Sequence, residues 1–221
     1  LNAWMPESRK RDLIYLNVPD PDQPFGFNPL EGVSPLRRSL AANGIVEALK
    51  KIFDAAWGVR LEYILRSALL LLLEQPEATL ADVVRLFHEK EFRKAAAERV
   101  TNEHVKRFWT VEFEKYGKDR ASAVTPIENK LGSLLVDPFV SRILTVSKST
   151  FNPREAMDEG RVLLVNLAKG KIGEAPAQLF GGLLVTALGL AGLGRADVPQ
   201  KGRRDFFIYM DEFQTFTTLA L

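Results

Sequence analysis

Two short apolar runs have the pattern of buried strands. DLIYLNV, residues 12–18, is rich in leucine and in β-branched or aromatic residues, and prolines and aspartates follow it directly. RVLLVNLAKG, residues 161–170, is a second run of this kind and ends in a Lys-Gly turn. Neither run alternates with polar residues as a half-solvated strand would, so we expect both strands to be buried.

The region between these runs has helical periodicity. From about residue 36 to about residue 146, most apolar residues recur at the spacing of one helix face. Three residue pairs in or just after this region are helix-start signals, either a capping box or an N-cap residue before proline: Thr79 with Asp82, Asp137 with Pro138 and Asn152 with Pro153. The pattern predicts an all-α insertion over residues 36–146.

After the second strand, an uncharged apolar run at 175–194 leads to RDFFIYMDEF, residues 204–213, which has the pattern of a third strand. Strand, helix and strand in this order indicate a parallel sheet covered on both faces. We therefore predict an α/β fold. Residues 1–35 and 147–221 would form a partial parallel-sheet core, and the all-α domain would be inserted between them.

The run at 175–194 is also about as long as a bilayer requires. It contains Gln178 and five glycines, and neither Trp nor Tyr flanks it as an interfacial anchor. A helix buried between a sheet and a second layer has the same composition, and this interpretation is favoured. The alternative is a membrane-associated structural protein anchored by these residues.

Composition narrows the range of functions. Thirty Lys and Arg stand against 28 Asp and Glu, and a net charge of +2 predicts no strong overall attraction to nucleic acid or anionic lipid. The absence of cysteine excludes disulfides and thiolate metal sites and fits a reducing compartment. His88 and His104 have no partner at metal-ligand spacing. The start of the chain lacks a signal-peptide pattern, and we expect residues upstream of it.

The candidate chemistry lies at Asp211 and Glu212, which follow five apolar residues of the predicted third strand. Doubly wound sheets bind ligands at the carboxyl ends of their strands, and adjacent carboxylates repel each other unless a cation shares the site. In P-loop nucleotide hydrolases an aspartate at this place helps to hold Mg²⁺. A following acid can accept a proton from the attacking water. The alternative is a solvated strand end.

The companion phosphate-binding loop, GxxxxGK[ST], does not occur in residues 1–221. LAKGKIG has its glycines and lysines at the wrong spacing, and GLAGLG has no lysine. These residues therefore cannot form a complete P-loop site.

Five segments in this order carry a family resemblance: GFNPLEG, the tract from KKIFDAAW to DVVRLF, PIENKLGSLLVDPFVSRIL, STFNPREAMDEGRVLLVNLAKGKIGE and FFIYMDEFQTF. The series is similar to conjugative DNA-transfer ATPases, the type IV secretion coupling proteins of the TraD and TraG kind within the HerA/FtsK superfamily. It covers essentially the whole chain. The resemblance implies a RecA-like motor core interrupted by an all-α domain, in a fragment that lacks the Walker A region.

By position, the resemblance implies a Walker B segment in which Asp211 binds the Mg²⁺ of Mg-ATP and Glu212 is the catalytic residue that activates water. ATP and Mg²⁺ would be cofactors of the parent protein. Lys169 and Lys171 would face phosphate or a neighbouring subunit, or would be solvated turn residues. Charge alone makes three arginines candidates for contacts between subunits: Arg154, Arg203 and Arg204.

The implied function is that of an ATP-driven DNA translocase, which moves DNA or nucleoprotein to a secretion or conjugation channel. Its partners would be DNA or a relaxase–DNA complex at the all-α domain, channel proteins and further copies in a homo-hexamer, on the cytoplasmic side of a bacterial membrane. The alternative is a non-catalytic helical module that recruits DNA-processing proteins. The aromatic residues of 90–120 are interpreted as core, because five glutamates among them oppose a DNA-stacking surface.

Overall fold

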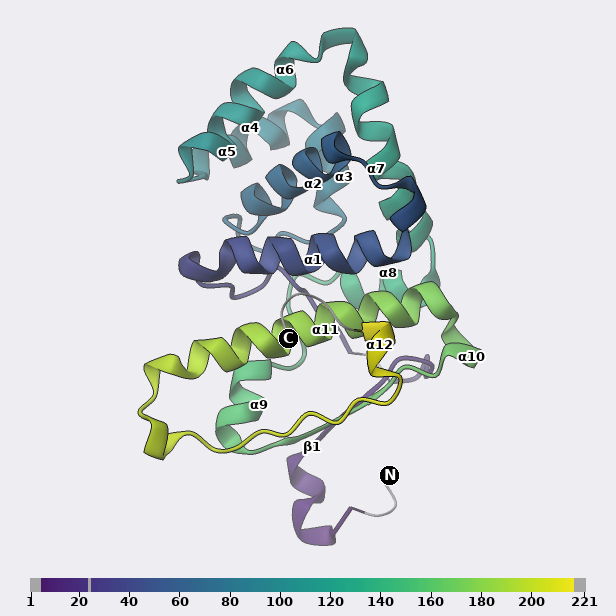
Figure 1. Cartoon of the computed structure of the whole chain (residues 1–221), viewed down its shortest axis with the longest axis vertical. Helices are drawn as coiled ribbons and strands as arrows, with labels where there is room; N and C mark the ends of the chain where they lie inside the picture. The colour runs from purple at the N-terminus through teal and green to yellow at the C-terminus, as the bar shows by residue number, and fades with distance from the viewer. Residues whose placement is uncertain (1–4, 24, 217–221) are drawn as a thin grey trace.

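The computed structural model describes residues 5–23 and 25–216, most of which are helical (Figure 1). Two strands, β1 (Leu13–Asn17) and β2 (Val162–Asn166), form a parallel sheet. The helices are α1 (Arg38–Ile52), α2 (Val59–Leu72), α3 (Asp82–His88), α4 (Lys90–Arg99), α5 (Glu103–Arg107), α6 (Phe113–Lys115), α7 (Arg120–Leu135), α8 (Pro138–Leu144), α9 (Pro153–Glu159), α10 (Lys169–Ile172), α11 (Glu174–Gly194) and α12 (Phe213–Phe216).

The two predicted strands and their parallel pairing are confirmed, but the expected burial is not, because Leu16 is the one buried residue of the two strands and the others are half-buried. The register runs from Leu13 opposite Val162 to Asn17 opposite Asn166. At the last position, Asn166 Nδ2 donates a hydrogen bond to Asn17 Oδ1 over 2.8 Å. The segment that connects β1 with β2 contains helices α1 to α9, so a mostly helical region interrupts a small parallel α/β core.

Helix α11 joins this core to the helical region. In Figure 1 it lies directly beneath α1, with the sheet and α9 farther below. Its Leu184 lies with Leu16 and Val165 around one small gap, and its Thr186 meets Gly44 of α1 at close range. The predicted burial between a sheet and a second layer is confirmed. Among the described residues, this helix alone is long and apolar enough to cross a membrane, and its packing on two sides accounts for the same composition.

The helical region has its own aromatic core. Phe108, Trp109 and Phe113 are each at most 2% exposed, and the rings of Trp109 and Phe113 lie 4.8 Å apart. The Trp109 indole N–H donates to the Ser67 carbonyl over 3.0 Å, which satisfies its polar group. For these three aromatic residues, the prediction of core rather than stacking surface is confirmed.

Two of the three helix-start signals are confirmed as caps. Asp137 accepts hydrogen bonds from the N–H groups of Phe139 and Val140, and Asn152 does the same at the start of α9. The carboxylate of Asp82 accepts from the Thr79 N–H over 2.7 Å, which is one half of a capping box. Asp137 and Asn152 satisfy N–H groups that the first helical turn leaves unpaired, whereas Thr79 does not cap α3, whose N-cap is Ala81.

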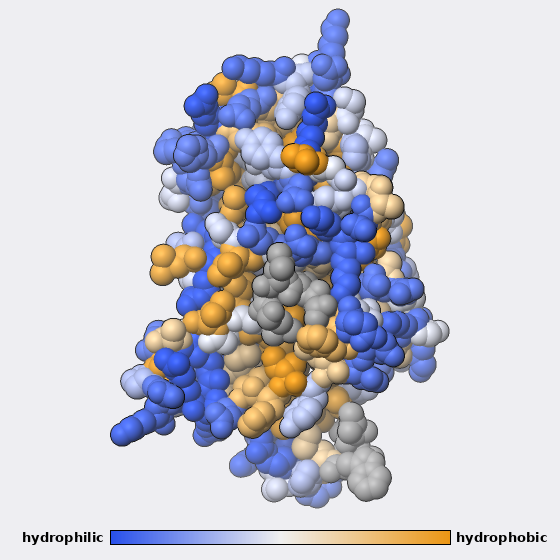
Figure 2. All heavy atoms as spheres, viewed as in Figure 1, coloured by the Kyte–Doolittle hydropathy of each residue, from blue (hydrophilic) through white to orange (hydrophobic). Residues whose placement is uncertain are grey.

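The predicted third strand at 204–213 is wrong for this structure. Residues 203–210 are extended but pair with no strand, and no peptide group of 205–210 makes a hydrogen bond to another described residue. The side chains of Phe207 and Tyr209 are 72% and 90% exposed. Figure 2 shows apolar side chains at the surface in the lower half of this face, where Figure 1 places this segment. Apolar composition predicted an extended segment, but a strand also needs ladder partners.

The segment nevertheless follows the direction of β2. At its start, Arg204 Nη1 donates to the carbonyl of Glu159, which precedes β2. Beyond its end, Thr215 accepts a hydrogen bond from Lys169, which follows β2. Residues 204–215 therefore run from the amino end of β2 to its carboxyl end.

Candidate functional site

Asp211 and Glu212 lie in a turn rather than at the end of a strand, which corrects the sequence-based expectation. We call residues 211–216 the acidic turn. Asp211 Oδ1 accepts a hydrogen bond from the Glu212 N–H over 3.0 Å, and the Glu212 carbonyl accepts from the Thr215 N–H over 2.8 Å. Gln214 Nε2 donates to the Glu212 carboxylate over 2.6 Å. The bonds within the turn thus fix the position of both acidic residues.

Glu212 has a strained backbone. Its φ is 53°, in the left-handed region, where a residue with a Cβ is disfavoured by roughly 1–2 kcal/mol. In the part of the chain that the structure describes, Glu77, with a φ of 58°, is the one other non-glycine residue of this kind. Such strain persists only where surrounding contacts over-determine the conformation, and it is frequent at functional sites.

Two lysines from distant elements attach the acidic turn to the fold. Lys169, the first residue of α10 behind β2, donates from Nζ to Thr215 Oγ1 over 3.2 Å. Lys51, near the end of α1, donates from Nζ to the carbonyl of Gln214 over 2.6 Å. The turn therefore lies beyond the carboxyl end of β2, and Lys169, one of the two lysines singled out by sequence, is one of its supports.

The ring of Phe216 anchors the other end of the turn on α11. A Cβ built on Gly181 would lie 2.6 Å from Phe216 Cε1 and closer still to Cδ1, so the absence of a side chain at Gly181 makes room for the ring. Sequence reasoning did not find this contact or the Lys51 contact. Both join residues that are far apart in the chain, and no local pattern marks them.

The acidic turn offers few ligands for a metal ion. Asp211 and Glu212 are exposed, and the described residues contain no group of three or more His, Asp or Glu side chains that could hold an ion. Of the two histidines, His88 pairs with Glu128, and the N–H of His104 belongs to the cap of α5. Mg²⁺ usually takes one or two carboxylates together with water and substrate phosphates. The turn thus fits Mg²⁺ bound jointly with a nucleotide better than Mg²⁺ alone.

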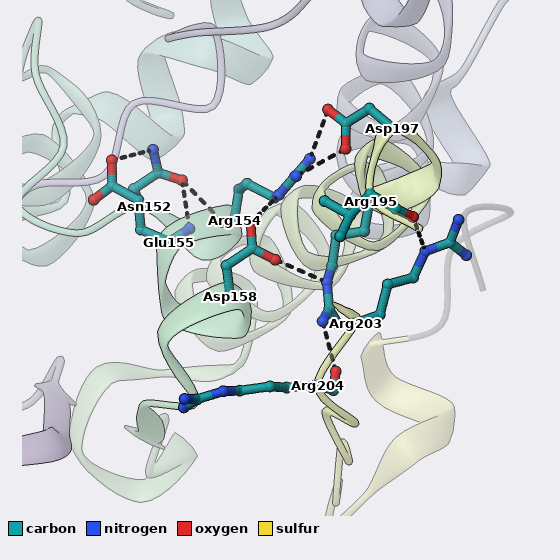
Figure 3. Close-up of polar contacts among 9 residues, drawn as sticks. Asn152, Arg154, Glu155, Asp158, Arg195, Asp197, Arg203 and Arg204 are labelled. Carbon is teal, nitrogen blue, oxygen red and sulfur yellow. Dashed lines mark hydrogen bonds and ion pairs between the residues drawn. The ribbon is translucent and has the colours of Figure 1, made fainter. Parts of the chain in front are cut away.

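Arg154 belongs to an ion-pair network that closes α9 onto the end of α11 (Figure 3). Its guanidinium contacts Asp158 and binds Asp197 through both Nη atoms, the shorter distance being 2.8 Å. Arg195 Nε lies 3.0 Å from the second oxygen of Asp158. The hydrogen bond from Arg154 lowers the pKa of Asp197, and the same bond raises the pKa of Arg154.

Arg203 and Arg204 bind backbone carbonyls of their own chain. Arg203 Nε donates to the Val198 carbonyl and Arg204 Nη1 to the Glu159 carbonyl, each over 2.7 Å. All three arginines that sequence marked as candidates for subunit contacts therefore hold the C-terminal end of α11 and the segment after it in place.

Comparison with known proteins adds no family to this description. The chain matches no protein-family model, no curated protein and no solved structure. The fold and the site define its class: a mostly helical protein with a partial α/β core and an acidic turn beyond the carboxyl end of a parallel strand.

Proposed function

We propose that residues 1–221 are part of an ATP-driven DNA translocase, a coupling protein with a RecA-like core that delivers DNA or nucleoprotein to a type IV secretion or conjugation channel. The observation that carries the proposal is the place of Asp211 and Glu212. Lys169, immediately behind β2, holds their turn beyond the carboxyl end of a parallel strand. Open α/β sheets bind their ligands outside this end of the strands.

Each acidic residue has its own role in the proposed reaction. Asp211 would hold Mg²⁺ against the nucleotide's phosphates. Glu212 would take a proton from water as the water oxygen bonds to the γ-phosphorus and the bond from that phosphorus to the bridging oxygen of ADP breaks. The phosphates would lie on a GxxxxGK[ST] loop, which residues 1–221 do not contain. The hydrogen bond from Gln214 Nε2, which orients the Glu212 carboxylate, and the backbone strain at this residue both support its role.

The extended segment that leads to the acidic turn fits the same proposal. Its first and last apolar residues, Phe206 and Met210, are half-buried, and the three between them are exposed: Phe207, Ile208 and Tyr209. The segment thus lies along the direction of β2 without joining the sheet. In a homo-hexameric ring at the cytoplasmic face of a bacterial membrane, the exposed side chains would be covered.

One observation favours a protein partner over naked DNA at the helical region. Phe108, Trp109 and Phe113 are buried and offer no stacking surface. Glu114 pairs with both Arg93 and Arg120, each over 2.9 Å, and Asp82 and Glu89 both pair with Arg85. A surface of paired charges lacks the excess of cations that phosphate binding requires. The region thus suits DNA-processing proteins such as a relaxase. Recruitment alone, without catalysis, is the second candidate function.

ATP turnover tests the proposal. The protein to use is a longer chain that joins residues 1–221 to a GxxxxGK[ST] loop, assayed with and without DNA as wild type, Glu212→Gln and the control Glu77→Gln. We expect DNA to stimulate turnover and Glu212→Gln to reduce it by at least about 100-fold, the lower range for loss of a general base, while ATP still binds. Equal turnover in all three proteins would refute the motor role. Relaxase binding that needs no nucleotide would then favour the recruitment module.

A further inference from the structure

A second concave site adjoins the small gap between α11 and the sheet, and Phe27 and Phe151 line both. It encloses about 530 Å³, a volume within the usual range of small-molecule pockets. Its walls come from four parts of the chain: the loop at 27–34, α1, the loop and helix start at 149–155, and α11. It shares no lining residue with the acidic turn, so a ligand there would be independent of the proposed ATP site.

The floor of this pocket is apolar and open because its residues are small. Ala41 of α1 and Ala187 and Ala191 of α11 leave the space, and Leu183 and Leu190 border it. Phe27 and Phe151 also line the pocket, and their rings lie 5.7 Å apart. A floor of this kind favours the flat or branched apolar body of a ligand over a polar one.

One guanidinium of the pocket, that of Arg37, forms no ion pair with a described carboxylate, although its charge helps to lower the pKa of nearby Asp197. Two guanidinium groups lie over Gly194, where an added Cβ would be 3.4 Å from Arg154 Nη1 and 3.9 Å from Arg37 Cζ. Arg154 is neutralised by two aspartates, as described above. Arg37 donates only to neutral oxygens, those of the Ser34 hydroxyl and the Leu193 carbonyl, and no ion pair joins it to any described carboxylate.

Two glutamates line the pocket as well, and neither pairs with Arg37. Glu31 accepts the N–H of Ser149 over 2.6 Å, and Glu155 accepts the amide of Asn152 over 3.2 Å. Arg37 therefore remains the charged group with unused donors, because a guanidinium has five N–H donors and only two of its hydrogen bonds are to described residues.

We propose that this pocket binds a small amphipathic anion, in which an apolar body lies on α1 and α11 and one carboxylate, phosphate or sulfonate group pairs with Arg37. A charge-assisted hydrogen bond to a fixed guanidinium supplies the specificity, and the apolar floor supplies most of the affinity.

Two fluorescent probes that differ mainly in charge test this proposal. 8-Anilinonaphthalene-1-sulfonate carries an anion on an aromatic body, and N-phenyl-1-naphthylamine has the same body without it. We expect both to bind the wild type at one site. Ala187→Phe, which fills the floor of the pocket, should lower the affinity for both probes at least about tenfold. Ala55→Phe, on an exposed turn, should leave both affinities unchanged.

The charge is tested separately. Arg37→Gln should lower the affinity for the sulfonate probe by about tenfold and change the affinity for the neutral probe by no more than about twofold relative to the wild type. Ser34→Ala removes one hydrogen-bond partner of Arg37 but keeps the charge of Arg37, and it should leave the affinity for both probes unchanged. Circular dichroism checks that each variant folds, and Ala191→Phe replaces Ala187→Phe if the latter does not fold.

Three results would overturn the proposal. The first is an equal loss of affinity for both probes in Arg37→Gln, and the second is unchanged affinity for both in a folded variant whose pocket floor is filled. The third is a loss of binding in Phe207→Ser, which would place the probes on the exposed segment before the acidic turn.

Discussion

Lys169 Nζ lies 3.2 Å from Thr215 Oγ1 and joins the residue that follows β2 to the turn that carries Asp211 and Glu212. The hydrogen bond spans 46 positions of sequence and determines where the two carboxylates lie relative to the sheet. Lys51 from α1 and the packing of Phe216 on Gly181 of α11 support the same position.

Removal of this contact should loosen the acidic turn. In Lys169→Met, we expect the amide of Thr215, which donates to the Glu212 carbonyl, to exchange its hydrogen roughly two to ten times faster, because a hydrogen bond contributes about 0.5–1.5 kcal/mol. Lys171→Met removes an exposed lysine of the same short helix and is the control. Unchanged exchange in Lys169→Met would mean that the turn is held without Lys169.

Glycine at position 212 should relieve the backbone strain. The gain of about 1–2 kcal/mol from the left-handed φ is partly offset by about 0.5–1 kcal/mol of extra chain entropy, so Glu212→Gly should leave stability unchanged or raise it by up to about 1.5 kcal/mol. Urea unfolding measures this difference.

Glu77→Gly is the matched control, since its φ of 58° is almost the same. It should have the same effect on stability, and in the chain with the phosphate loop it should keep the turnover that Glu212→Gly loses. Glu98→Gly, in the exposed face of α4, should instead destabilise by about 1 kcal/mol. If Glu212→Gly, Glu77→Gly and Glu98→Gly all destabilised the protein by a similar amount, this would contradict the backbone strain at Glu212.

The packing of α1 on α11 should not tolerate a methyl group at Gly44. A Cβ there would lie 2.7 Å from the Thr186 hydroxyl oxygen and closer still to its methyl group. We expect Gly44→Ala to destabilise by roughly 1–3 kcal/mol despite the better helix propensity of alanine, as measured by urea unfolding. Gly132→Ala in α7, where nothing lies within 4 Å of the added Cβ, should stabilise by about 0.5–1 kcal/mol.

The pair of Glu114 with Arg93 should make stability depend on pH. The hydrogen bond from Arg93 lowers the pKa of Glu114 below its ordinary value of 4.5, and Arg120 adds to the shift. A group whose pKa is lower in the folded state stabilises the fold above its unfolded pKa. This contribution is lost as the pH falls through the folded pKa.

Glu114→Gln should therefore be less stable than the wild type at about pH 7, and the difference should shrink steadily as the pH falls from about 4.5 towards about 3. Urea unfolding at several pH values gives this difference. Glu98→Gln, whose carboxylate has no ion-pair partner among the described residues, should differ little from the wild type at any of them. A gap that stays constant with pH in Glu114→Gln would contradict the assigned pair.

Much of the local structure follows from sequence because its causes are local. Asp137 and Asn152 cap helices that start with proline, and Gly160 ends α9 with a φ of 69°. The apolar runs of β1 and β2 predicted strands, and the order of the elements predicted their parallel pairing. In each case the residues that decide the outcome lie within a few positions, or the chain topology leaves few alternatives.

The segment 204–210 shows where this reasoning fails. Its apolar residues are those of a buried strand, but hydrogen-bond partners on a neighbouring strand decide whether such a segment becomes one. The expectation that Asp211 and Glu212 end a strand was wrong for the same reason. Their turn depends on the backbone angle of Glu212 and on contacts that no spacing in the sequence encodes.

The sequence by itself determined the helix boundaries marked by caps, the two strands, the aromatic core of the helical region and the absence of a phosphate loop from residues 1–221. Each of these depends on residue type and periodicity. Only the tertiary structure decided that Lys51 and Lys169 support the acidic turn, that Arg154 is neutralised while Arg37 is not, and that small residues of α1 and α11 leave a pocket. These features arise because side chains far apart in the chain meet in the fold, and the sequence pattern of one segment does not predict which distant residues it will contact.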